Sequence, residues 1–184
     1  EVGQQTLRSY IPKQLLLVGS ASYNDDGSTT EGTAEGGRQI VLYSVNDFNF
    51  ELEQIQSYAH VMHHEFAHIL HQNVEYDAEF EKITPSYSSS WMQMNDETAR
   101  SKGFITAYAF SSADEDFAEM VSIMLTNSPE DWDNMIENAG NAAAVEALRK
   151  KEAIVVAYMK NNWGVNMKDF QKEVVAAIEA AVRN

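Results

Sequence analysis

The stretch LEQIQSYAHVMHHEFAHILHQ, residues 52–72, decides the fold of this chain. On a helical wheel, one set of apolar residues falls within about 120°, which predicts a side that faces the core: Ile55, Tyr58, Ala59, Met62, Phe66, Ile69 and Leu70. A set of histidines falls within about 80° on another side: His60, His64, His68 and His71. The stretch therefore predicts a long helix that packs on one side and carries imidazoles on another.

The segment His64-Glu65-Phe66-Ala67-His68 has the pattern His-Glu-x-x-His. Histidines four residues apart on a helix lie one above the other, so both imidazoles can bind one Zn²⁺ at about 2.0–2.1 Å. Glu65 lies beside them, where it can take a proton from a metal-bound water. The alternative is a buried helix whose histidines are satisfied by hydrogen bonds or by water. Four imidazoles on one side, with Glu65 in place, favour the zinc site.

A catalytic zinc needs a third protein ligand and an open position for water. His71 lies seven residues, about 10.5 Å, along the helix axis from His64, which one ion can hardly span. Glu75 is farther still. A carboxylate from a second helix is therefore the better candidate for the third ligand.

Glu115 and Glu119 are four residues apart on a helix predicted over about 114–125. On spacing alone, Glu115 and Glu119 are comparable candidates for the third ligand. Ser112-x-x-Glu115 is also a capping-box pattern, in which Glu115 would only bond the backbone of the N-cap residue.

The remaining pattern predicts an α+β fold in one domain, residues 1–184, with a β-containing part at 1–50 and a mostly helical part at 51–184. A polar entry segment is expected over 1–13, strands over 15–18 and 39–45, and a polar loop over 24–37. Helices are expected at about 77–82, 92–102, 129–138, 142–160 and 167–182.

Composition narrows the function classes. The 184 residues carry 13 Lys and Arg against 28 Asp and Glu, a net charge of −15, which repels nucleic acids. The chain has no cysteine, so thiol catalysis and thiolate metal sites are excluded. Its apolar runs, such as 153–159, are far shorter than the roughly 20 residues of a membrane span. Since it begins at Glu1, we expect it to be a processed piece of a longer protein.

The two segments His64–His68 and Glu115-Asp-Phe-Ala-Glu119 resemble those of the gluzincin metallopeptidases. Residues 106–119 look particularly like the catalytic segment of the lethal-factor-type members. That resemblance implies that Glu115 is the third zinc ligand and that Tyr108 stabilises the oxyanion. It leaves Glu119 as a partner that orients a zinc-bound histidine, a task for which Asp114 and Asp116 are alternatives.

A closer likeness is to the substrate import-associated zinc metallohydrolase lipoproteins of Bacteroidetes, over residues 38–127. It implies a zincin-like fold and a peptidase exported to the cell envelope, lipid-anchored, beside outer-membrane uptake proteins. In the zincin architecture an edge strand of the sheet runs along the substrate cleft, and 40–45 is our candidate for it. The alternatives are a degenerate, metal-stabilised binding protein and an acidic helical module with an accidental motif.

Overall fold

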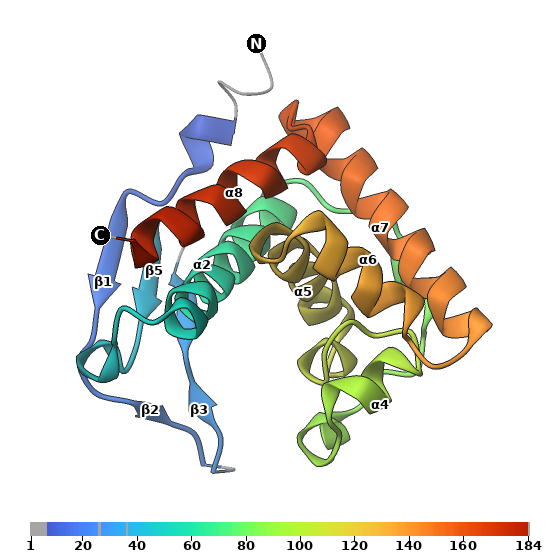
Figure 1. The fold of residues 1–184 in the computed structure, drawn as a ribbon, viewed down its shortest axis with the longest axis horizontal. Helices are drawn as coiled ribbons and strands as arrows, with labels where there is room; N and C mark the ends of the chain where they lie inside the picture. The colour runs from blue at the N-terminus through green and yellow to red at the C-terminus, as the bar shows by residue number, and fades with distance from the viewer. Residues whose placement is uncertain (1–6, 26, 36, 184) are drawn as a thin grey trace.

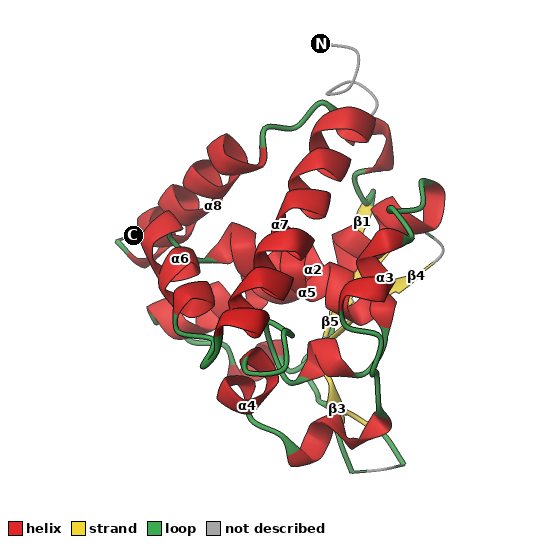
Figure 2. Cartoon of the chain, turned by 90° about the vertical axis from the view of Figure 1, so that its right-hand side faces the viewer, coloured by secondary structure: helices red, strands yellow, loops and turns green. Residues whose placement is uncertain are grey.

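The computed structural model describes residues 7–25, 27–35 and 37–183 (Figure 1). The expected entry segment, residues 1–13, lies partly outside the described residues, and its residues 7–10 form a helical turn. Figure 2 shows that helices make up most of the described chain and that the strands form a small part. The fold is therefore α+β, as the sequence predicts.

Helix α2, Leu52–Asn73, runs through the middle of the molecule (Figure 1). It contacts strands on one side and the later helices α5 and α8 on the other. Ala67, Ile69 and Leu70 are at most 1% exposed. The predicted helix over 52–72 is confirmed to within one residue, and packing on both sides explains why it holds its neighbours together.

The sheet in the described part of the chain has the strand order β1-β5-β4. Strand β1, Gln14–Leu17, runs parallel to β5, Gln39–Leu42, and β4, Gly32–Glu35, runs antiparallel to it. Ile40 and Leu42 pack against α2, and all three apolar residues of β5 are at most 5% exposed. The middle strand therefore anchors the sheet to the helix.

The prediction that residues 40–45 form the edge strand beside the cleft is wrong, because β5 is paired on both sides. The edge strand next to α2 is β4, which lies in the segment predicted as a polar loop. Position 32 must be small, since a Cβ on Gly32 would overlap Cγ1 of Val61 on α2. The same predicted loop contains most of an antiparallel ribbon, β2 (Ser22–Tyr23) with β3 (Thr29–Thr30).

The helices follow the predicted order. A 3₁₀ turn, η1 (Val45–Asp47), precedes α2. The elements after α2 are α3 (Glu79–Ile83), η2 (Ser89–Gln93), α4 (Asp96–Arg100), η3 (Tyr108–Phe110), α5 (Ala113–Thr126), α6 (Pro129–Glu137), α7 (Ala142–Trp163) and α8 (Met167–Val182). The predicted helix over 92–102 is too long. The Asn95 side chain accepts a hydrogen bond from the amide of Thr98, so α4 begins only there.

Helix α5 lies at the centre of the core. It contacts α2, α6, α7 and α8. Phe117, Ala118 and Met120 are completely buried, and fully burying a side chain such as Phe117 contributes about 1.5–3 kcal/mol. Among the described residues, no helix combines the length and apolar character that a membrane crossing requires.

Candidate metal centre

Two adjacent helices bring the predicted ligands together. His64 and His68 lie on α2, and Glu115 lies in the first turn of α5. The Ser112 hydroxyl accepts a hydrogen bond of 3.3 Å from the amide of Glu115, which fixes the start of α5. The hydrogen bond from the Glu115 amide to Ser112 is one half of the predicted capping box. The Glu115 carboxylate instead contacts the imidazoles of His64 and His68 on α2.

The three side chains meet through one atom each. Nε2 of His64 and Nε2 of His68 are 3.0 Å apart, and Oε2 of Glu115 is 2.9 Å from the first and 3.1 Å from the second. Tetrahedral zinc with bonds of about 2.0–2.2 Å separates neighbouring ligand atoms by about 3.3 Å. A shift of a few tenths of an ångström would therefore suit these three atoms to zinc.

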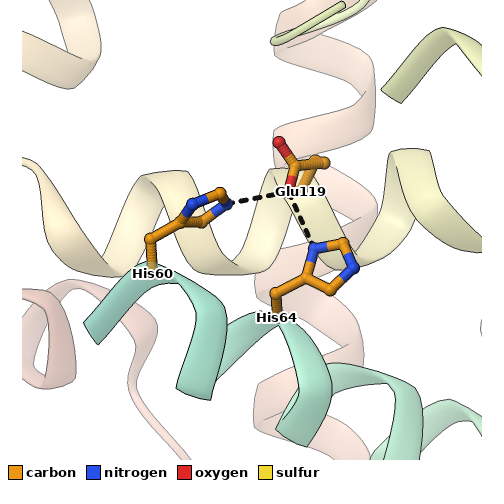
Figure 3. Close-up of side chains that lie close together, drawn as sticks. All are labelled: His60, His64 and Glu119. Carbon is orange, nitrogen blue, oxygen red and sulfur yellow. Dashed lines mark hydrogen bonds and ion pairs between the residues drawn. The ribbon is translucent and has the colours of Figure 1, made fainter. Parts of the chain in front are cut away.

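Behind His64 lies a second carboxylate, that of Glu119 (Figure 3). Its Oε1 is 2.7 Å from Nδ1 of His64 and 2.8 Å from Nε2 of His60, and its Oε2 accepts a 2.6 Å hydrogen bond from the Thr106 hydroxyl. Glu119 is only 2% exposed. Because a carboxylate only accepts hydrogen bonds, His64 donates through Nδ1, and in its neutral form Nε2 carries the lone pair.

The inner cluster, formed by His64, His68 and Glu115, is stabilised by positive charge. Burial opposes ionisation of His64, but hydrogen bonds to Glu115 and Glu119 outweigh it and raise its pKa to about 10. Burial likewise opposes ionisation of Glu115, but hydrogen bonds from His64 and His68 lower its pKa to about 2. A divalent cation would offer positive charge to all three inner atoms at once, so the residues fit zinc.

His60, His64 and Glu119 also lie close enough to hold an ion. Their contacts, however, are already complete as hydrogen bonds onto one carboxylate oxygen. An ion there would replace the hydrogen bond that fixes His64. The chemistry of the donor atoms thus favours the cluster of His64, His68 and Glu115.

Glu65 projects from α2 beside this cluster, as the motif predicts, and it lines a cleft that His64 and Glu115 also line. The backbone amide of Ala34 on strand β4 lies close to its carboxylate. Burial raises the pKa of Glu65, while the nearby His64 and His68 and the Ala34 amide act in the opposite direction. Sequence patterns do not indicate the proximity of Ala34, because they predict a loop where β4 lies.

Tyr108 faces the cluster from η3. Its ring centroid is 5.8 Å from that of His64, and Trp91 packs edge-on against it at 4.9 Å. Burial raises the pKa of Tyr108, and the charges of Glu115, Glu119 and Glu65 raise it further. The tyrosine is therefore protonated at neutral pH and available as a donor.

A cleft of about 630 Å³ joins these residues. The β2–β3 ribbon and Gly32 at the start of β4 form one wall, and Trp91, Tyr108 and Ser111 form the other. Glu65 and Glu115 line the floor. The cleft therefore has a free strand edge on one side and a protonated tyrosine on the other.

The other candidate residues have different positions. The prediction that Asp116 could orient a ligand histidine is wrong, because its Oδ2 lies in the core, 2.5 Å from Nζ of Lys151. Nδ1 of His63 bonds the Ala59 carbonyl at 2.7 Å on a different side of α2. His71 does not meet the inner cluster; its Nε2 is 2.9 Å from Nδ1 of His68. Its spacing of three residues from His68 is the signal for this contact.

Comparison with known proteins identifies the family of the chain. The family described as "Putative zinc-binding metallo-peptidase" matches residues 1–168. A crystal structure of a putative zinc-binding metallo-peptidase from Bacteroides caccae is similar, with a TM-score of 0.79 and 35% sequence identity over 96% of this chain and 69% of that one. No curated protein is detectably similar to the chain. The chain thus belongs to the family described as putative zinc-binding metallo-peptidases.

Proposed function

We propose that the protein is a zinc-dependent metallopeptidase that hydrolyses peptide bonds. The observation that supports this most strongly is the meeting of His64 Nε2, His68 Nε2 and Glu115 Oε2 within 3.1 Å, with Glu65 beside them. Zinc held by these three residues would supply a Lewis acid that acidifies water and polarises a carbonyl group.

Glu65 is the proposed general base and acid. It accepts a proton as water adds to the peptide carbonyl, and it returns that proton to the nitrogen as the C–N bond breaks. A partly buried carboxylate with a raised pKa suits both steps, because it binds the proton and releases it within one turnover.

Tyr108 is the proposed donor to the carbonyl oxygen as negative charge develops on it. The raised pKa keeps its hydroxyl protonated, and the phenol lies on the same cleft as Glu65. A donor placed in this way typically contributes about 3–4 kcal/mol to the transition state.

Strand β4 is the proposed binding edge for an extended peptide. The Ala34 amide faces away from β5, because the hydrogen-bonded pairs of the antiparallel register alternate from the pair Glu31 and Tyr43. Gly32 lines the cleft. Free backbone groups on an edge strand can pair with a peptide, which gives affinity without a strict sequence requirement. The substrate class is therefore a peptide or an extended protein segment.

The resemblance to the Bacteroidetes lipoproteins supports two further proposals. The full-length protein is exported and lipid-anchored at the cell envelope, and it works beside outer-membrane uptake proteins. Cell fractionation of a tagged full-length protein tests the first. Its recovery with the cytoplasmic fraction would contradict the proposal.

The deciding experiment compares wild type with Glu65→Gln. We expect about one zinc per chain in both proteins, because Glu65 is not a ligand. Only wild type should cleave a proteome-derived peptide library, since an amide cannot accept the proton. Zinc without cleavage in wild type would instead indicate a metal-stabilised binding protein, and a wild type without zinc would remove the metal site.

A further inference from the structure

The second ligand histidine, His68, contacts another imidazole on its far side. Its Nδ1 is 2.9 Å from Nε2 of His71, while its Nε2 faces His64 and Glu115. Two neutral imidazoles in such contact share one proton, so one ring donates and the other accepts. The direction of this hydrogen bond decides whether His68 can bind a metal.

Only one direction is compatible with ligation. If His68 donates through Nδ1, its Nε2 carries the lone pair and faces the cluster. If His71 donates instead, the proton of His68 moves to Nε2 and blocks the position that zinc needs. His71 must therefore accept through Nε2 and keep its own proton on Nδ1.

Asp114 favours this arrangement. Its Oδ1 is 3.9 Å from Nδ1 of His71, so its negative charge attracts the proton to that nitrogen, directly or through a bridging water. The Tyr76 hydroxyl donates a 2.8 Å hydrogen bond to the same oxygen. The charge that selects the tautomer of His71 is thereby held in place.

Aromatic packing fixes the geometry of this chain of contacts. Tyr76 stacks on Phe117 of α5 with centroids 4.4 Å apart and planes at 12°. The His71 ring packs edge-on against both, with centroids 5.6 Å and 6.0 Å away, and His71 is 7% exposed. The ring therefore has little freedom to turn its Nε2 away from His68.

We propose that His71 is a positioning residue that selects the metal-binding tautomer of His68, and that Asp114 and Tyr76 select the tautomer of His71. This inference rests on the proposed zinc site. It gives the two ligand histidines different supports: His64 is backed by the buried carboxylate of Glu119, and His68 by a neutral imidazole.

Zinc affinity measured by competition with a chromophoric chelator tests the role of His71. His71→Leu should weaken zinc binding by roughly 10–100-fold, as is typical when an outer partner of a ligand histidine is lost. His71→Gln should recover most of the affinity, because its side-chain oxygen can accept from Nδ1 of His68. The control is His63→Leu, which removes an imidazole from the same helix and should leave affinity unchanged.

Nitrogen-15 NMR of the zinc-loaded wild type tests the tautomer directly and needs no variant. We expect His71 with its proton on Nδ1 and none on Nε2. A proton on Nε2, or wild-type zinc affinity in a folded His71→Leu protein, would overturn the inference while leaving the zinc site intact. A wild type that binds no zinc would instead contradict the proposed function, so the two failures are distinguishable.

Discussion

Glu115 and Glu119 have the same side chain on the same helix, four residues apart, yet they meet different atoms of His64. Glu115 contacts Nε2 from the cleft, and Glu119 contacts Nδ1 from inside the core. Glu119 receives further hydrogen bonds from His60 and Thr106. One helix turn therefore separates a candidate metal ligand from the group that orients its partner.

This difference predicts unequal damage from two alanine substitutions. Glu115→Ala should abolish stoichiometric zinc binding, because it removes one of three donor atoms. Glu119→Ala should weaken binding by about 10–100-fold, since His64 remains but its orientation is no longer fixed. Metal titration of both variants, with circular dichroism to confirm folding, measures the order. The reverse order would mean that ligand and orienting group are exchanged.

Tyr108→Phe tests the proposed donor to the carbonyl oxygen. The variant should keep its zinc and its melting temperature, because the phenol ring retains its packing against Trp91. It should lower kcat by roughly 10²-fold or more with a smaller effect on KM, since the lost hydrogen bond forms mainly in the transition state. A stable, zinc-loaded and fully active variant would remove Tyr108 from the mechanism.

At the scale of elements, a buried ion pair joins α7 to α5. Lys151 and Asp116 are both fully buried; the ammonium group bonds the carboxylate at 2.5 Å and the Gly103 carbonyl at 2.8 Å. It also lies 4.2 Å from the centroid of the Phe104 ring. Burial raises the pKa of Asp116 to about 6 despite the attraction of Lys151. The pair therefore holds the helix that carries Glu115 against α7.

Lys151→Met should destabilise the protein by about 3–5 kcal/mol, because it leaves a buried carboxylate without its cationic partner. The double variant Lys151→Met with Asp116→Leu should recover a large part of that loss. Lys150→Met is the matched control: this neighbouring lysine is exposed and pairs with Glu146 at the surface, so stability should hardly change. Urea unfolding of all three measures the differences, and equal effects at 150 and 151 would contradict the account.

The sequence predicts those elements best whose signals are local. Helix α6 begins at its Ser128 cap and Pro129, and α2 shows a clear apolar period. The sequence does not predict strand β4, because residues 32–35 have no apolar alternation; the strand forms because it pairs with β5 and packs on α2. Lys151 gave no signal either, since a lysine in a run of charged residues looks solvated. Contacts between distant elements decide both cases.

The residues of the candidate site differ in the same way, because some roles follow from local spacing and others from contacts between elements. The relative positions of His64, Glu65 and His68 can be predicted from the sequence, because one helix sets their spacing. The likeness to a known family, and not spacing, favoured Glu115 over Glu119. The role of His71 depends on the rotamers of two rings and on a charge from α5, so only the structure could place it.

For the whole molecule, metal removal should lower stability by mass action. An ion that binds only the folded state adds about 2.7 kcal/mol at a free concentration 100 times its dissociation constant. For a chain of this size that corresponds to roughly 5–10 °C in melting temperature. Scanning calorimetry with zinc and with a chelator measures the shift, and Glu115→Ala should show none. Identical melts of wild type would argue against a zinc site between α2 and α5.

His68 and Glu115 are 47 residues apart in the chain, yet their facing atoms are 3.1 Å apart. The segment between them carries the cleft wall with Trp91 and Tyr108. An ion between its two ends would close this segment into a ring in the folded protein and would restrict its local opening. Zinc would then tether the wall that faces the substrate as well as serve the chemistry, whereas α7 and α8 lie outside the ring.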